Sequence, residues 1–159
     1  MKNRLRAMRL RLVAMVVVAV VAGLAASAQA APGAAARLSV RSTEYGKALF
    51  GPSGKVVYVF GADRRSTSRC YSVCATAWPP LLTSAAPLAS AGVDAKLLGT
   101  TKRTDGTSQV TYNGHPLYYY SADKVGKVMC QDANVHGGLW LVIKPNGQPN
   151  MAKGKMMMK

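Results

Sequence analysis

The chain repeats itself at an interval of sixty residues. Shifting the sequence by this interval superimposes turn glycines, aromatic residues, acids and a cysteine. The matched pairs are Leu38 with Leu98, Gly46 with Gly106, Gly54 with Gly114, Tyr58 with Tyr118, Phe60 with Tyr120, Ala62 with Ala122, Asp63 with Asp123 and Cys70 with Cys130, while Trp78 and Trp140 correspond two residues out of step. Two copies are too few for a solenoid, so we expect a duplicated unit whose halves bury one face against each other.

Both copies carry the pattern of short antiparallel strands. The dipeptide Asn113-Gly114 lies between residues 109–112 and 115–120, which are rich in aromatic and β-branched residues. Such a dipeptide favours a hairpin, because a type I′ turn needs positive φ at both central positions. The other predicted strands are residues 97–102 and 138–144 in the second copy, and 37–41, 47–50 and 55–60 in the first.

Helical signals are nearly absent beyond the first thirty residues. No long stretch has an apolar period of 3.6 residues, and only a short helical turn over residues 71–77 fits, before Trp78-Pro79-Pro80. The predicted fold is therefore all-β, with two pseudo-repeats of three to four antiparallel strands packed as one small domain. The expected organisation is a signal peptide (1–30), a flexible lead-in (31–36), repeat 1 (37–82), a linker (83–92), repeat 2 (93–150) and a disordered Lys/Met tail (151–159).

The N-terminus has the three-part pattern of a secretory signal peptide. Five basic residues among the first eleven precede an apolar run over residues 12–26, and Ala28 and Ala30 form an A-x-A cleavage site. The run is too short for a membrane span, which needs about 20 residues, and no later run is long enough. The first cysteine is Cys70, so no lipid acceptor lies near the cleavage point. We expect an exported protein of the periplasm, cell envelope or extracellular space.

The predicted mature chain is strongly basic. Removing the first thirty residues leaves 16 Lys and Arg against 6 Asp and Glu, a net charge of +10. This charge favours contact with anionic envelope polymers, lipid headgroups or an envelope protein over nucleic acid, which an exported chain does not meet. A solvated basic face is the simpler interpretation. The candidate anion contacts are Arg64, Arg65, Arg69, Lys102 and Arg103.

Several motifs in order resemble one bacterial family. The sequences Tyr-Val-Phe-Gly-Ala-Asp (58–63) and Tyr-Tyr-Tyr-Ser-Ala-Asp (118–123) both match Y-x-[FWY]-x-x-D. Together with C-x-x-x-C-A-x-x-W-P-P-L (70–81) and G-G-x-W (137–140), they are similar to the secreted-repeat family often labelled predicted lipoprotein. The resemblance covers about residues 38–147. The resemblance implies membership of this family but not a biochemical activity, because the family has no established biochemical function.

The motif residues have a structural and a chemical interpretation. Side chains two apart on a strand share a face, and an aspartate three residues further on can accept backbone N–H groups in a turn. We favour this core-and-turn role, because duplication preserves residues that build the fold. A ligand or acid–base site shared between the copies is the alternative. The residues concerned are Tyr58, Phe60, Asp63, Tyr118, Tyr120 and Asp123, with Trp78 and Trp140.

The three cysteines allow one disulfide and leave one thiol. An oxidising compartment favours a bridge, and we favour Cys70–Cys74 over Cys70–Cys130. The Cys70–Cys74 bridge needs an irregular segment, because an ideal helical turn holds such a pair poorly. A C-x-x-x-C spacing is not the C-x-x-C of thioredoxin-like enzymes, so redox catalysis is disfavoured.

Metal and catalytic signals are weak. Cys130, His136 and Asp132 have suitable ligand types in a spacing that matches no strong template, and the methionine tail would suit Cu(I). The sequence contains no phosphate-binding loop, H-E-x-x-H or G-x-S-x-G motif. We therefore expect a non-enzymatic module without a cofactor. A metal (Cu or Zn) handling protein is the first alternative, and an enzyme with a site between the repeats is the second.

Overall fold

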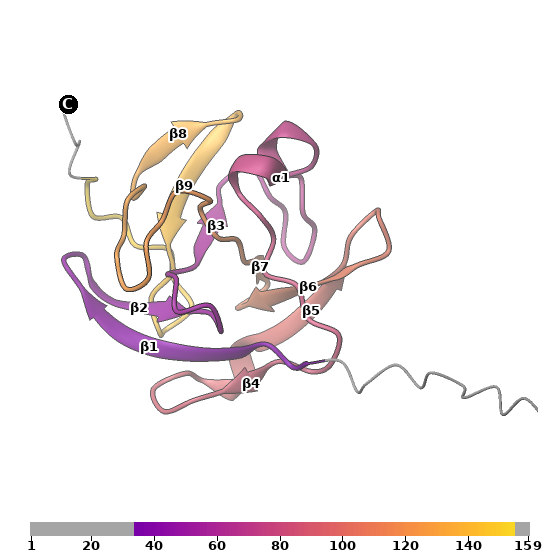
Figure 1. Cartoon of the computed structure of the whole chain (residues 1–159), viewed down its shortest axis with the longest axis horizontal. Coiled ribbons are helices and arrows are strands. Elements are labelled where there is room, and N and C mark those ends of the chain that lie inside the picture. The colour runs from indigo at the N-terminus through magenta and orange to yellow at the C-terminus, as the bar shows by residue number, and fades with distance from the viewer. Residues whose placement is uncertain (1–33, 155–159) are drawn as a thin grey trace, which may run out of the picture.

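The computed structural model describes residues 34–154, drawn in colour in Figure 1. The predicted signal peptide and residues 155–159 of the predicted tail lie outside this range. In chain order the elements are β1 (Arg37–Thr43), β2 (Gly46–Phe50), β3 (Tyr58–Phe60), α1 (Val73–Ala77), β4 (Leu88–Ala89), the 3₁₀ turn η1 (Ala95–Leu97), β5 (Leu98–Lys102), β6 (Ser108–Tyr112), β7 (His115–Pro116), β8 (Ala133–Val135) and β9 (Gly138–Val142). The predicted all-β class is confirmed.

These strands form three small sheets with the orders β2-β1-β4, β3-β9-β8 and β5-β6-β7. All pairs are antiparallel except β1 with β4. In Figure 1, β1 curves along one side of the molecule with β2 and β4 beside it, and α1 lies at the opposite side near β3. The predicted Asn113-Gly114 turn is confirmed: both residues have positive φ, at 49° and 76°, and Tyr112 pairs with His115.

The two repeats exchange their last strands. Strand β9 of the second repeat pairs with β3 of the first, with Trp140 opposite Phe60 and Val142 opposite Tyr58. Reciprocally, residues 78–82 of the first repeat bridge to the second, with Pro80 opposite Tyr118. The halves are therefore interlaced through backbone hydrogen bonds rather than only packed face to face.

Two buried clusters fill the interior. One is mainly aliphatic, and its fully buried members include Leu38, Leu49, Val110, Leu117 and Ile143. The other is mainly aromatic and contains residues of both repeat motifs, both tryptophans and Cys70. Exchange of strands brings each tryptophan against the motif of the opposite repeat, so the aromatic cluster lies where the repeats meet.

Several boundaries differ from the sequence predictions. The predicted strand over residues 115–120 is regular only at β7, and that over 55–60 only at β3. The predicted linker contains β4, whose Leu88 N–H donates to the carbonyl of Ala36. Ala36 itself is buried, although it belongs to the predicted flexible lead-in. The start of the predicted tail is also held in place, because the Gln131 side chain donates a hydrogen bond to the carbonyl of Ala152.

Within residues 34–154, no helix has the length and apolar character needed to cross a membrane.

Candidate functional site

The two Tyr/Asp motifs meet at a pseudo-two-fold axis. The backbones of Tyr58 and Tyr118 exchange two hydrogen bonds, of 2.8 and 3.0 Å between N and O. Each aspartate closes a turn, because the Asp63 N–H donates to Phe60 and the Asp123 N–H to Tyr120. Each carboxylate also accepts a backbone N–H six residues on, from Arg69 at 2.7 Å and from Met129 at 2.9 Å.

Six aromatic rings surround this axis with matching geometry. Trp78 and Trp140 stack with ring centroids 3.9 Å apart. Each tryptophan meets the edge of one motif tyrosine at 5.2 Å, Trp78 with Tyr58 and Trp140 with Tyr118. Each also contacts the second motif ring of the opposite repeat, Trp140 with Phe60 at 4.2 Å and Trp78 with Tyr120 at 4.6 Å. The tryptophans and both motif tyrosines are buried, so this stack is part of the core rather than a ligand surface.

The first cluster, which we define as Asp63, Ser68, Arg103, Gln109 and Tyr118, is a hydrogen-bonded network. The Tyr118 hydroxyl lies 2.7 Å from both Ser68 Oγ and Asp63 Oδ2. Arg103 Nη1 donates to Ser68 and to Gln109, each at 2.8 Å. Asp63 therefore accepts hydrogen bonds from the Tyr118 hydroxyl and from the Arg69 backbone N–H, and the guanidinium of Arg103 lies nearby.

Arg103 was predicted to be an anion contact at the surface, but it is buried. Only 5 % of the residue is exposed, and Nη2 donates to the carbonyl of Cys70 at 2.8 Å. Its guanidinium also lies 4.3 Å from the ring centre of Tyr71. Three buried oxygen acceptors surround Nη1 and Nη2, whereas Nε has no hydrogen-bond partner among the described residues and lies 3.6 Å from the carboxylate of Asp105.

The second cluster, which we define as Tyr58, Tyr120, Asp123 and Cys130, is built differently. Asp123 Oδ2 and the Tyr58 hydroxyl are buried and have no hydrogen-bond partner among the described residues. The two groups nevertheless interact, because burial and then the Asp123 carboxylate raise the pKa of Tyr58, while the Tyr58 hydroxyl lowers the pKa of Asp123, which burial raises. The half-buried thiol of Cys130 and the hydroxyl of Tyr120 lie beside them.

Burial raises the pKa of the carboxyl group in both clusters. For Asp63, burial outweighs the hydrogen bonds from Tyr118 and Arg69 and the charge of Arg103, and the pKa is about 6. For Asp123, burial again dominates, and the pKa is also about 6. Burial likewise raises the pKa of the Cys130 thiol, and the charge of Asp123 raises it further. Neither aspartate is ionised as readily as a surface carboxylate.

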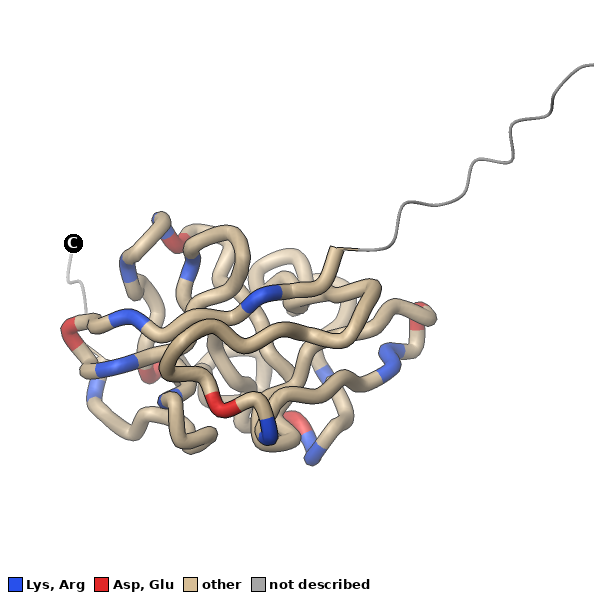
Figure 2. Tube along the Cα trace, turned by 90° about the horizontal axis from the view of Figure 1, so that it is seen from below, with Lys and Arg blue, Asp and Glu red and all other residues tan. Residues whose placement is uncertain are grey.

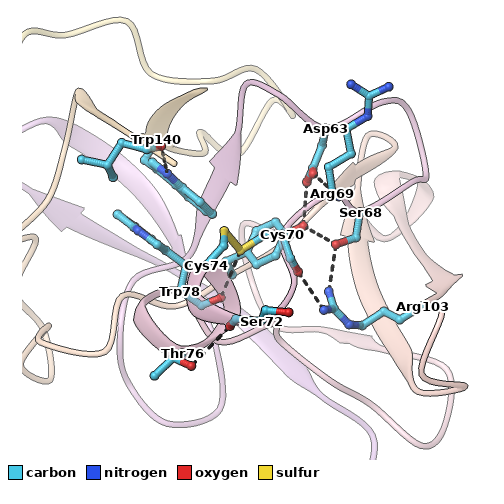
Figure 3. The surroundings of a disulfide bond; sticks show 12 residues. Asp63, Ser68, Arg69, Cys70, Ser72, Cys74, Thr76, Trp78, Arg103 and Trp140 are labelled. Atoms are coloured by element: carbon cyan, nitrogen blue, oxygen red, sulfur yellow. Dashed lines mark hydrogen bonds between the residues drawn. A yellow bond between two sulfur atoms is a disulfide. The ribbon is translucent and has the colours of Figure 1, made fainter. Parts of the chain in front are cut away.

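The disulfide joins Cys70, in the loop before α1, to Cys74 in the first turn of α1, as predicted (Figure 3). Cys70 is fully buried beside Trp78, and its carbonyl accepts Arg103 on the other side. The bridge thus ties the loop after the first motif both to the aromatic core and to the first cluster. Cys130, the repeat equivalent of Cys70, is a free cysteine.

Reduction of this disulfide should lower the free energy of unfolding by about 2 kcal/mol, because the closed loop is short. Urea unfolding with and without reductant measures the change in the Cys130→Ser background, where no third thiol can exchange. The Cys70→Ala/Cys74→Ala variant in the same background should match the reduced protein. A loss below about 0.5 kcal/mol in both would contradict the structural role of the bridge.

The predicted metal ligands are not gathered into one group. Asp132 accepts a hydrogen bond from Gly154 and pairs with Lys153, and His136 is exposed in the turn between β8 and β9. Among residues 34–154, no group of three or more His, Cys, Asp or Glu side chains is placed to hold a metal ion. The local turn separates Cys130, His136 and Asp132 despite their closeness in sequence.

The other predicted basic residues lie at the surface. Arg64, Arg65 and Arg69 are exposed in one loop that follows the first motif, and Lys102 is exposed at the end of β5. Figure 2 shows basic positions on several sides of the molecule, with acidic positions among them. The part of the chain described here has ion pairs only at Arg103–Asp105 and Lys153–Asp132, so the three loop arginines have no carboxylate partner.

Sequence reasoning missed Ser68 and Gln109 as members of the first cluster. A signal was available in the repeat itself. At an interval of sixty residues, Ser68 corresponds to Val128 and Arg103 to Thr43, so two polar groups differ together between the copies. Such paired differences indicate a network that one copy has and the other lacks.

A protein-family model described as a secreted repeat of unknown function matches the chain twice, over residues 39–82 and 99–144. The two matched segments coincide with the two copies of the repeat and together cover more than half of the sequence. No curated protein and no solved structure matches the chain.

Proposed function

Because the chain belongs to the family described as a secreted repeat of unknown function, we propose that it is an exported, non-enzymatic module that binds anionic envelope polymers. The observation that carries the proposal is the loop of residues 64–69, which we call the arginine loop. It presents three exposed arginines and no exposed acid. Guanidinium groups suit phosphate and carboxylate, because their planar donors match the oxygen pairs of these anions.

The arginine loop is held in place by the scaffold beneath it. Arg64 and Thr67 exchange two backbone hydrogen bonds, of 3.2 and 3.0 Å. The Ser66 N–H donates to the Gly114 carbonyl at 2.7 Å, so the loop is fastened to the turn between β6 and β7. A loop already held in one shape loses little conformational freedom on binding, which favours affinity for an extended anion.

The electrostatic surroundings of the loop are also suited to anions. Asp63, which precedes the loop, directs Oδ2 inward to Tyr118, and its Oδ1 accepts the backbone N–H of Arg69. Burial and then the charge of Arg65 lower the pKa of His115, so the positive charge of the loop also acts on this ring. Burial raises the pKa of Asp63 while the charge of Arg69 lowers it, but none of the three loop arginines forms an ion pair with a carboxylate among residues 34–154, so the positive potential of the loop is offset only in part.

The test is binding of the mature chain, residues 31–159, to beads that carry polyphosphate or polyglutamate. Replacing Arg64, Arg65 and Arg69 by Gln should weaken binding by about a hundredfold, at about 1 kcal/mol for each basic residue near an anionic surface. Binding of the native protein should fall steeply between 0.15 and 1 M salt, because the Debye length shrinks from about 8 to about 3 Å.

A matched control removes the same charge elsewhere, at the exposed Lys47, Lys96 and Lys127, each replaced by Gln. This variant should lose much less affinity than the arginine-loop variant. Equal losses in the two variants would show that net charge alone attracts the polymer, and the assignment to the arginine loop would fail. Absence of binding at low salt would reject the function altogether.

A further inference from the structure

The loop after each Tyr/Asp motif is fastened in the same way to a glycine turn of the opposite repeat. In the first repeat the Ser66 N–H donates to the Gly114 carbonyl at 2.7 Å, and in the second the Gly126 N–H donates to the Gly54 carbonyl at 3.0 Å. The four residues correspond at an interval of sixty. The turn glycines share a positive φ, at 76° and 73°. The duplicated fold therefore builds one loop over each turn glycine.

The side chain that lies over the turn glycine differs between the copies. A Cβ at Gly114 would lie 2.8, 2.9 and 3.1 Å from Cγ, Cζ and Nε of Arg65. A Cβ at Gly54 would lie 3.1 Å from Cγ1 of Val125, the repeat equivalent of Arg65, with Arg41 farther away at 3.8 Å. Since the second loop is fastened with valine in this place, the fold needs only an apolar stem there. The guanidinium of Arg65 is not required to hold the loop.

The guanidinium of Arg65 is nevertheless held in one place. Its Nη1 donates to the Asn113 carbonyl at 3.2 Å, and its stem and Cζ lie against Gly114, so the side chain follows the turn. Nε and Nη2 form the edge that pairs with two oxygens side by side. Among residues 34–154 this edge has no hydrogen-bond or ion-pair partner, and Arg65 is exposed.

The other two arginines of the loop are not held through their side chains. Neither Arg64 nor Arg69 makes a side-chain hydrogen bond or ion pair to the part of the chain that the structure describes. Arg69 is fixed only through its backbone N–H, which Asp63 accepts, and its side chain points away from the buried network (Figure 3). Ordering a free arginine side chain on binding costs conformational entropy, whereas Arg65 is already ordered.

We propose that the Nε–Nη2 edge of Arg65, held on the Asn113-Gly114 turn, is a discrete binding site for one oxyanion group with two oxygens side by side, a phosphate or a carboxylate. The inference rests on the proposed polymer binding and deepens it, because one held guanidinium, rather than the summed charge of the loop, then dominates affinity. Lysine cannot replace Arg65 in this site, because an ammonium group offers no pair of coplanar donors.

The first test keeps the charge and removes the paired donors. Binding of mature Arg65→Lys to polyphosphate and polyglutamate beads is measured at 0.15 M salt. We expect about tenfold weaker binding, the scale of a lost charge-assisted hydrogen bond. Arg64→Lys and Arg69→Lys are the matched controls, and each should change binding by less than about twofold, because an exposed charge is only exchanged for another. A loss on one kind of bead alone would assign the site to that anion.

The second test displaces Arg65 without changing any charge. In Gly114→Ala the new Cβ would clash with the Arg65 stem and guanidinium, so binding should again weaken by about tenfold. Gly106→Ala is the matched control, because Gly106 also has positive φ, at 82°, and a Cβ there would meet no atom within 4 Å. Both variants should lower the melting temperature similarly, but only Gly114→Ala should lose affinity.

A third variant separates the site from the folding of the loop. Arg65→Val copies the residue of the second repeat, so it should melt near the native temperature and bind at least as weakly as Arg65→Lys.

Native affinity in Arg65→Lys would overturn the site, as would equal losses in the three single lysine variants or in Gly114→Ala and Gly106→Ala. If the arginine-loop variant still lost binding in those cases, polymer binding by the loop would stand without a discrete site. Unchanged binding in the arginine-loop variant would instead reject the proposed function together with the site.

Discussion

Replacing Trp140 by Ala should lower the free energy of unfolding by about 3–5 kcal/mol, the usual cost of deleting a buried aromatic side chain. The ring is fully buried and stacks against Phe60 and Trp78, with centroids 4.2 and 3.9 Å away. Its indole N–H donates to the carbonyl of Val135 at 3.2 Å, so the β8–β9 hairpin also depends on it. Urea unfolding followed by far-ultraviolet circular dichroism measures the loss.

The position of Trp140 makes the expected effect large. Strand β9 is the strand that the second repeat contributes to the first, and Trp140 faces Phe60 in that pairing. Trp140→Phe keeps a ring in the stack and should cost less than half as much as Trp140→Ala. Val73→Ala alters an apolar side chain that is 77 % exposed and should change stability by less than about 0.5 kcal/mol. Equal effects of Trp140→Ala and Val73→Ala would contradict a core role for the stack.

Local features of this chain could be predicted from the sequence because short-range physics determines them. Asn113-Gly114 forms its turn since both residues tolerate positive φ. The helical turn ends before Trp78-Pro79-Pro80, and Cys70 reaches Cys74 because only one irregular turn separates them. In each case the deciding contacts lie within a few residues.

The exchange of strands could not be predicted in this way. Pairing of Trp140 with Phe60 joins residues eighty positions apart, and burial of the whole aromatic cluster decides it. Strand β4 is equally nonlocal, because two residues of a Ser/Ala/Pro-rich linker gain their order only from the edge of β1.

Arg103 shows why charge patterns are weak predictors of surfaces. Its neighbour Lys102 is exposed, and the dipeptide has the composition of a solvated turn. Alternation along the β5–β6 hairpin nevertheless turns Arg103 inward, where Ser68, Gln109 and the Cys70 carbonyl accept its N–H groups. A buried arginine is recognisable only once its acceptors are known, and these come from distant segments.

Replacing Arg103 by Met should lower the free energy of unfolding at pH 8 by about 3 kcal/mol, because removing one member of a buried charged network leaves the others unsatisfied. Gln109 Oε1 and the Cys70 carbonyl would lose their Arg103 donor, and the Asp63 carboxylate would lose the nearby positive charge. Urea unfolding at several pH values measures the loss. Arg65→Met, which alters an exposed arginine, is the control and should change stability by less than about 0.5 kcal/mol.

The defect of Arg103→Met should shrink as the pH falls. The pKa of Asp63 is about 6 in the folded protein and 3.8 in the unfolded chain, and loss of Arg103 should raise the folded value further. A folded pKa above the unfolded one means that the folded state binds the proton more tightly, so stability increases as the pH falls through 6 toward 4. The gain in stability between pH 6 and 4 should be larger in Arg103→Met than in the native protein.

The Asp63→Asn/Arg103→Met double variant carries no carboxylate to protonate at this position, so its stability should follow the shallower pH profile of Asp63→Asn. If the double variant instead kept the steep pH dependence of Arg103→Met, Asp63 would not be the group that responds to the missing charge.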